Sequence, residues 1–165
     1  MIDLQEIVDT FIENPLLGIG YYGPLLLIFI NMYFLYDRFF WFIIYILFVI
    51  INTCINKTLK IIIKEPRPDN WKAFSSLEKL QNEERYGMPS GHAQCLGFSL
   101  VFYYLLFGLN EILYLMLFIS VLTVFQRYHN RNHTFLQLII GLVIGGLLAY
   151  IVYFFSKKYK NKNLL

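Results

Sequence analysis

The chain has 165 residues, of which 58% are hydrophobic and only 15% are charged, whereas a soluble domain carries about 25% charged residues. This composition favours a single-domain integral membrane protein, residues 1–165, over a soluble one. The formal net charge of +3 is too small and too scattered to indicate nucleic-acid binding. A buried helical bundle within a soluble protein is the alternative fold.

Apolar residues recur at helical spacing within residues 1–14, and acidic residues occupy the opposite face. The apolar set is Leu4, Ile7, Val8, Phe11 and Ile12. The Asn14-Pro15 step ends this pattern. We therefore expect an amphipathic helix that lies at the membrane interface or packs on the rest of the chain.

Five apolar runs follow, and together they predict an all-α bundle with about five transmembrane helices. The runs cover approximately residues 16–36, 39–55, 92–109, 112–125 and 135–155. Several fall slightly short of the roughly 20 residues that cross about 30 Å of hydrocarbon. A thin bilayer such as that of the endoplasmic reticulum suits them better.

Five spans place the N-terminus and the polar segments 64–91 and 126–134 on one face of the membrane. The basic tail, residues 156–165, then lies on the other face and should be cytoplasmic by the positive-inside rule. Lys57, Lys60 and Lys64 would lie on the non-cytoplasmic face, against the usual bias. Cations held there indicate a function, and we expect that face to be luminal.

The stretch 86–94 joins a polar segment to an apolar helical run. Within it, Ser90 can cap the helix, and Gly91 lets the backbone approach a ligand closely. The first free N–H groups of this helix, with the positive end of its dipole, form an anion site beside His92. The simpler interpretation is a Pro-Ser-Gly helix break followed by an incidental histidine.

Three cations accompany this predicted anion site. Lys60 and Arg67 are two helical turns apart and would face the same way if the helix continued between them. Arg127 precedes His133 near the start of the last apolar run. With the N–H groups of residues 90–92, these cations would surround one phosphate. Taken singly, each is also typical of a helix-end cation that reaches toward the interface.

Two histidines complete the predicted chemistry. The Gln137 carbonyl oxygen, one turn after His133, can accept the Nδ1–H of that ring and leave Nε2 as a nucleophile. His92 can protonate the leaving oxygen, and two such histidines imply a phosphohistidine intermediate. No carboxylate cluster is present to hold magnesium or zinc, so we expect neither a metal nor another cofactor. Glu65 and Asp69 are interpreted as solvated loop residues.

Three stretches resemble the motifs of the type 2 phosphatidic acid phosphatase superfamily, in the same order and with the same internal spacing, across residues 57–137. They are residues 60–68, 89–92 and 127–133. The resemblance implies a helical bundle with its site at the outer or luminal face of a membrane. It also implies His133 as nucleophile, His92 as acid, and, as phosphate ligands, Lys60, Arg67, Ser90, Gly91 and Arg127.

The differences from the superfamily indicate a branch. The superfamily usually carries Ser before the motif arginine and Asp four residues after the nucleophile, where this chain has Gln126 and Gln137. Residues 65–68, 86–94 and 133–137 look much like the dolichyldiphosphatase branch, which also carries Gln after its His-Thr pair. Gly91 replaces a second Ser common in that branch. The superfamily core usually has six spans, and five are counted here.

We therefore expect a membrane phosphatase of the endoplasmic reticulum that converts dolichyl diphosphate into dolichyl phosphate and phosphate. Its partners are the lipid diphosphate substrate and the bilayer. The alternatives are another lipid phosphatase, acting on phosphatidate or undecaprenyl diphosphate, and a catalytically silent membrane scaffold. The sequence sets neither the lipid chain length nor the oligomeric state.

Overall fold

The computed structural model describes residues 14–74 and 86–163, which form five α-helices and no β-strand. The helices are α2 (Pro15–Leu35), α3 (Phe39–Ile63), α5 (Gly91–Phe107), α6 (Glu111–His129) and α7 (Phe135–Asn163). The predicted all-α bundle is confirmed. The predicted amphipathic helix falls, except for Asn14, outside the described residues.

Four of the described helices, α2, α3, α6 and α7, are long and apolar enough to cross a membrane. The fifth, α5, has 17 residues, about 25 Å at 1.5 Å per residue, slightly less than the hydrocarbon core of about 30 Å. Three predicted helix ends were too early. α3 continues past residue 55 to Ile63, and α6 continues past residue 125 to His129. α7 continues through most of the predicted tail to Asn163.

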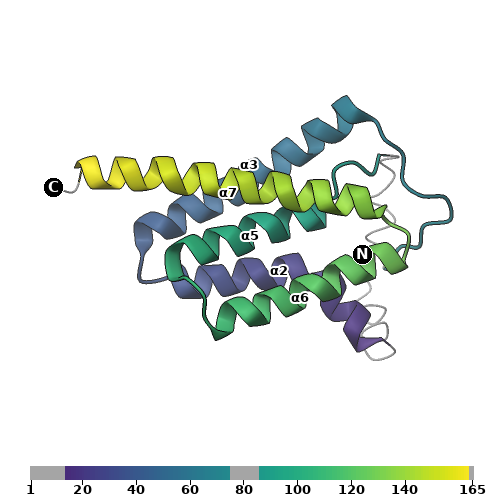
Figure 1. Cartoon of the computed structure of the whole chain (residues 1–165), viewed down its shortest axis with the longest axis horizontal. Coiled ribbons are helices and arrows are strands. Elements are labelled where there is room, and N and C mark those ends of the chain that lie inside the picture. Colours follow the sequence, from purple (N-terminus) through teal and green to yellow (C-terminus); the bar gives the residue numbers. More distant parts are fainter. Residues whose placement is uncertain (1–13, 75–85, 164–165) are drawn as a thin grey trace, which may run out of the picture.

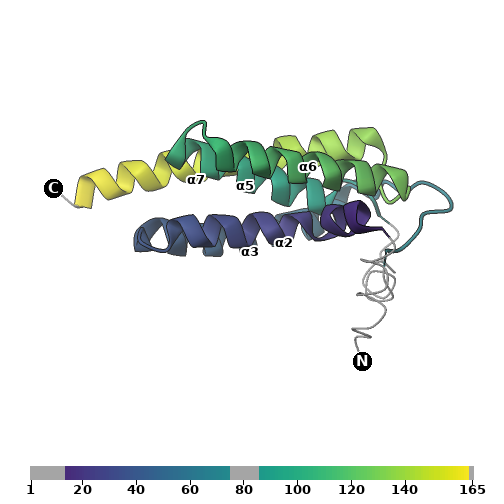
Figure 2. The ribbon, with the colours of Figure 1, turned by 90° about the horizontal axis from the view of Figure 1, so that it is seen from below.

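The helices form two layers, with α2 and α3 in one layer and α5, α6 and α7 in the other (Figure 2). α5 packs against all four of the other helices, and most extensively against α7. Its side chains Leu96, Phe98 and Phe102 have no exposed surface. The shortest of these helices is therefore the central one, around which the longer apolar helices assemble.

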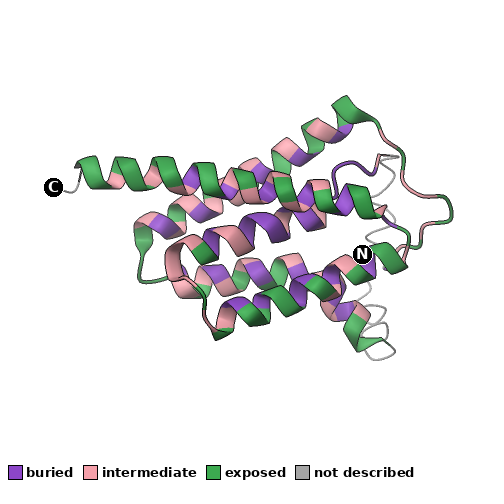
Figure 3. Cartoon of the chain, in the orientation of Figure 1, coloured by how far each residue is buried: buried purple, intermediate pink, exposed green. Residues whose placement is uncertain are grey.

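The outer helices turn apolar side chains outward. Phe29 on α2, Ile50 on α3, Phe118 on α6 and Leu147 on α7 are all more than half exposed. Figure 3 shows such exposed segments along the outer helices, whereas buried segments dominate α5. Large outward-facing apolar surfaces fit hydrocarbon and not water, in agreement with a membrane-spanning bundle.

The connections that carry the sequence motifs lie at one end of the bundle (Figure 1). α3 and α6 end there, α5 and α7 begin there, and the C-terminal end of α7 lies at the opposite end. The predicted common face of segments 64–91 and 126–134 is thus present for their described residues. Residues far apart in the sequence can therefore meet in one site.

Glycines allow α5 and α7 to approach each other closely. A β-carbon added at Gly145 on α7 would overlap the backbone carbonyl oxygen of Gln94 on α5. One added at Gly97 on α5 would overlap the carbonyl oxygen of Leu142 on α7. Because backbone atoms are met in both cases, a larger residue can fit only if the helices separate. Small residues commonly permit such backbone contact between membrane helices.

We expect Gly145→Ala to lower the free energy of unfolding by roughly 1–3 kcal/mol, the range for overpacking a tight contact. Gly146→Ala is the matched control, because a β-carbon there meets only the Val101 side chain at 3.3 Å and the Gly97 carbonyl oxygen at 3.9 Å. Thermal unfolding of both variants in one detergent measures the difference. Equal midpoints would contradict a backbone contact at Gly145.

Candidate active site

The structure brings predicted site residues from several helices and connections to one end of the bundle. Lys60 lies in the last turn of α3, Ser90 caps α5, and Arg127 lies in the last turn of α6. Arg67 and His133 lie in the connections that follow α3 and α6. Lys60 is 8% exposed and Arg127 only 1% exposed, so both cations are held inside the protein and not along its lipid-facing surface.

The helical path from Lys60 to Arg67, on which their predicted common orientation depended, is not present. α3 ends because Lys64 adopts a left-handed conformation with φ 55°. Arg67 reaches the site from the following turn, where its Nη1 lies 3.5 Å from the Asn132 carbonyl oxygen. Its guanidinium also lies 5.5 Å from the centroid of the Trp71 ring. Both cations still act on His92 and His133, and a turn, not helical periodicity, brings Arg67 there.

The turn after α3 pairs with the chain that leads into α5. The Gly87 N–H donates to the Glu65 carbonyl oxygen at 2.7 Å. Pro66 and Tyr86 form an isolated antiparallel bridge. These backbone contacts hold the Glu-Pro-Arg-Pro segment against the Pro-Ser-Gly-His segment, so the first two predicted motifs form one connected structure.

A buried amide network fixes the start of α5 against α3. Asn56 donates from Nδ2 to Gln94 Oε1 at 2.8 Å and to the Pro89 carbonyl oxygen at 3.2 Å. Gln94 donates from Nε2 to Asn52 Oδ1 at 2.8 Å. Buried amides are strongly destabilising unless they are paired, so this network specifies one register. Asn56 lies one helical turn before Lys60 in α3, so the network places the N-terminus of α5 near Lys60.

Ser90 caps α5 as predicted, with its side-chain oxygen 3.5 Å from the Ala93 nitrogen. The helix begins at Gly91, where an added β-carbon would meet Asn56 Oδ1 at 3.1 Å. The first N–H groups of a helix have no carbonyl partner within it. The start of α5 therefore offers donors and a positive dipole end to an anion.

His133 lies in a strongly positive environment and is 3% exposed. Burial is the largest cause that lowers the pKa of His133 well below its ordinary value, and the positive charges of Arg127, Arg67 and Lys60 lower this pKa further. All three predicted cations are thus close enough to act on this ring. At neutral pH the ring is uncharged, which is the form that can act as a nucleophile.

Gln137 determines which nitrogen of His133 carries the proton. Gln137 Nε2 lies 2.9 Å from the Pro66 carbonyl oxygen, which can only accept, so this atom of the amide must be the donor. Oε1 then accepts from the Thr134 N–H at 3.3 Å and faces His133 Nδ1 at 3.2 Å. Because Oε1 can only accept, Nδ1 carries the proton and Nε2 keeps its lone pair. The predicted His133–Gln137 contact is present.

Glu65 contacts this network, and its interpretation as a solvated loop residue is wrong. Its carboxylate oxygen Oε1 accepts from Gln137 Nε2 at 2.8 Å, across 72 positions of sequence. Asp69 is exposed, as predicted. In the sequence, the only sign that Glu65 belongs to the site was its position two residues before Arg67. Nothing in the apolar pattern indicates which loop faces α7.

His92 lies among the same cations as His133, since Arg127, Arg67 and Lys60 all act on it electrostatically. On its other side, the Tyr21 ring of α2 lies 5.8 Å away between ring centroids. Tyr21 in turn stacks on Phe74 at 4.7 Å. Neither aromatic residue was among the predicted site residues. Tyr21 lies in an apolar run, where an aromatic residue most simply indicates lipid-facing surface, and Phe74 lies in the polar segment 64–91.

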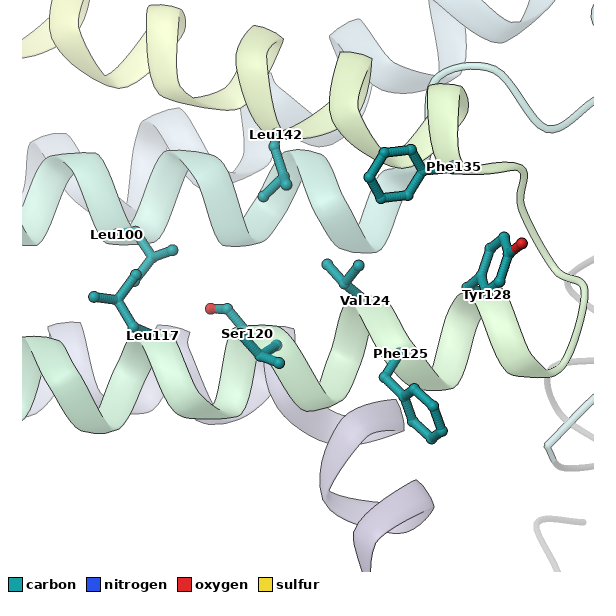
Figure 4. A pocket seen from close by; sticks show the side chains of 9 residues that line it. Leu100, Leu117, Ser120, Val124, Phe125, Tyr128, Phe135 and Leu142 are labelled. Atoms are coloured by element: carbon teal, nitrogen blue, oxygen red, sulfur yellow. The ribbon is translucent and has the colours of Figure 1, made fainter.

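Two adjoining pockets lead from the side of the bundle to His133. An apolar groove of about 630 Å³ lies between α5, α6 and α7, lined in part by Val124 and Leu142 (Figure 4). Tyr128 and Phe135 line one end of this groove and also line a second pocket of about 700 Å³ that includes His133. An apolar ligand chain in the groove would therefore point its head toward the histidine.

Among the described residues, no group of three or more His, Cys, Asp or Glu side chains could hold a metal ion. Lys60, Arg67 and Arg127 instead supply fixed positive charge around both histidines. Such a set of cations suits an anionic ligand with several oxygens, because Arg presents a planar fork and Lys a compact point charge.

We expect histidine-selective ¹⁵N NMR of the protein in detergent at pH 6.5, the ordinary pKa of histidine, to show a neutral His133 ring with its proton on Nδ1. Arg127→Gln should raise the pKa of His133, because one of the neighbouring positive charges is removed. His133→Ala assigns the signal. A proton on Nε2, or titration at or above 6.5, would contradict the described environment.

Comparisons with known proteins show the family of this chain. The family model of the PAP2 superfamily matches residues 41–160. Dolichyldiphosphatase 1 of Dictyostelium discoideum is 29% identical over 116 residues, which cover 64% of this chain and 48% of that protein. Dolichyldiphosphatase of Saccharomyces cerevisiae is 28% identical over 115 residues, 64% of this chain and 47% of its own length. The match thus spans about half the length of these relatives, and no solved structure matches significantly. The chain belongs to the PAP2 superfamily.

Proposed function

We propose that this protein is a metal-independent phosphatase that hydrolyses an isoprenoid diphosphate lipid, with dolichyl diphosphate as the first candidate. One observation carries the proposal: a buried, neutral His133 lies among three cations at the end of an apolar groove. The cations fit a phosphate, the imidazole fits nucleophilic chemistry, and the groove fits a lipid chain.

In the first step, His133 Nε2 attacks the terminal phosphorus of the diphosphate. An N–P bond forms while the bond from phosphorus to the bridging oxygen breaks, and the lipid monophosphate leaves. The negative charge of the bound diphosphate favours the protonated form of His92, which donates its proton to the leaving oxygen. Lys60, Arg67 and Arg127 stabilise the charge on the remaining phosphoryl oxygens.

In the second step, water attacks the phosphohistidine, and His92 accepts a proton from that water. The N–P bond breaks, inorganic phosphate leaves, and His133 returns to its neutral form. The backbone N–H groups at the start of α5, which Ser90 caps and Gly91 begins, bind phosphoryl oxygens in both steps. Every proton and leaving group is then accounted for without a cofactor.

The choice of an isoprenoid diphosphate rests on two observations. The relatives reported above are both named dolichyldiphosphatase. The apolar groove adjoins the pocket of His133 through Tyr128 and Phe135, so a long chain can stay in the bilayer while its head reaches the histidine. The same groove accommodates phosphatidate, so direct comparison of substrates decides between them.

We further propose that the site faces the lumen of the endoplasmic reticulum. All the motif-bearing connections lie at one end of the bundle, and the last basic residues of α7, Lys160 and Lys162, lie at the other (Figure 1). Basic residues next to a span favour the cytoplasmic side. The phosphate site is then non-cytoplasmic.

Purified protein in chelator is expected to release phosphate from dolichyl diphosphate faster than from phosphatidate in the same detergent. His133→Ala should lower kcat by roughly 10³-fold or more, because loss of a nucleophile leaves only binding and electrostatic stabilisation. Tyr114→Ala is the control, since Tyr114 is exposed near the start of α6, at the end of the bundle opposite His133.

Full activity in His133→Ala would exclude this nucleophile. Faster release from phosphatidate would assign a different lipid substrate. Release from no lipid phosphate would indicate a catalytically silent scaffold.

A second prediction concerns the groove. Val124→Trp should fill it and lower kcat/KM for dolichyl diphosphate roughly 10-fold or more, because a filled pocket rejects chain it previously accepted. Activity on a short, water-soluble isoprenoid diphosphate should be unchanged. Phe118→Trp, also on α6 but 59% exposed, is the control. Equal losses on both substrates would show that the groove does not hold the lipid chain.

A further inference from the structure

A chain of hydrogen bonds joins the buried histidine to a carboxylate in another loop. His133 Nδ1 lies 3.2 Å from Gln137 Oε1, and Gln137 Nε2 lies 2.8 Å from Glu65 Oε1. The amide is held in this orientation by Pro66 and Thr134, as derived above. Its dipole therefore points its oxygen at the ring and its nitrogen at the carboxylate.

In the proposed reaction, the uncharged Gln137 amide cannot by itself neutralise the positive charge that forms on the His133 ring. When Nε2 attacks phosphorus with a proton still on Nδ1, the His133 ring becomes positively charged. Lys60, Arg67 and Arg127 already lower the pKa of this ring, so they oppose that charge. A neutral amide can accept the Nδ1–H, but it brings no net negative charge.

Glu65 brings that charge from the turn after α3. Its position is fixed independently of His133, because the Gly87 N–H donates to the Glu65 carbonyl oxygen at 2.7 Å and Lys64 ends the helix just before it. Both fixed points are backbone features, and Gln137 Nε2 holds the carboxylate itself. Pre-organised charge of this kind stabilises a developing charge without reorganisation.

We propose that Glu65 is a positioning residue of the phosphatase reaction, which acts through Gln137 to orient His133 and to stabilise its positive charge in the phosphohistidine step. This inference rests on the proposed function. In it, Gln137 is a polar connector and Glu65 is the carboxylate that the chain lacks at position 137. No bond to Glu65 forms or breaks, and its proton count stays the same.

The charged and titratable groups around His133 come from every neighbouring element. Lys60, Arg67 and Arg127 act on the ring electrostatically, and His92 lies among the same three cations. Asp69, His129 and Arg131 line the same pocket as His133. Glu65 differs from Asp69 because hydrogen bonds through the Gln137 amide connect its carboxylate to the ring.

Glu65→Gln tests the charge while a hydrogen bond to Gln137 is kept, because the new amide oxygen can still accept from Nε2. We expect kcat to fall roughly 10- to 100-fold, the range for loss of a residue that acts through another, with KM changed little. The pKa of His133 and the acidic limb of kcat/KM should both move to lower pH, because a negative charge has been removed. Asp37→Asn removes an exposed acid from the connection between α2 and α3, at the opposite end of the bundle, and should change neither.

A double variant keeps the charge but moves it. Glu65→Gln combined with Gln137→Glu places the carboxylate directly beside His133, with the new amide as its partner. We expect kcat to recover at least several-fold over Glu65→Gln alone, and the pKa of His133 to rise again. A purely structural contact predicts the opposite, because the second substitution adds a further disturbance.

The outcomes are separable. If Glu65→Gln is slow but the NMR titration of His133 is unchanged, or if the double variant is no faster than Glu65→Gln, Glu65 only holds the loop and the inference is overturned. If the wild-type protein hydrolyses no lipid diphosphate, the proposed function fails. In that case an unchanged His133 titration in Glu65→Gln still refutes the coupling, and a shifted one still establishes it.

Discussion

The site depends on one buried amide, that of Gln137, which contacts all three motif-bearing segments. Its Nε2 donates to Glu65 and to the Pro66 carbonyl oxygen, and its Oε1 faces His133. Its backbone carbonyl oxygen accepts from the Ser90 N–H at 3.1 Å. Because a buried amide left without partners is strongly destabilising, these contacts form together or not at all. A hydrophobic residue at 137 would remove the side-chain contacts to His133, Glu65 and Pro66 and leave only the backbone contact to Ser90.

The packing of α5 against α7 explains why these contacts can meet. A β-carbon at Gly141, one turn after Gln137, would meet the Ser90 carbonyl oxygen at 2.6 Å. Farther along the same interface, Gly145 lies against the backbone of Gln94. The start of α7 is thus held against the start of α5 by the same glycine contacts that hold the bundle. Fold stability and site geometry share one interface, and a change in helix spacing would displace the candidate site.

Much of this arrangement follows from the sequence, and the part that does not has a physical reason. The apolar runs predict the five helices, and Ser90 predicts the N-terminal cap of α5. The one-turn spacing between His133 and Gln137 predicts their contact. The end of α3 is not predicted, because polar residues can continue a helix beyond the hydrocarbon. The helix ends only where the backbone changes conformation, at the left-handed Lys64. Glu65 is missed because its partner lies 72 positions away, and only tertiary structure brings the two together.

In the proposed reaction, the position of Glu65 also resolves a conflict between phosphate binding and the reactivity of His133. A site for a diphosphate needs several cations, but those same cations lower the pKa of His133 and so weaken it as a nucleophile. A carboxylate in direct contact with the ring would restore basicity, yet it would bring negative charge closer to the anionic substrate. A Gln137 amide between the two keeps that charge two hydrogen bonds from the ring. Because Coulomb interactions fall with distance, the nearer ring gains more stabilisation from Glu65 than the phosphate, on the opposite nitrogen, loses.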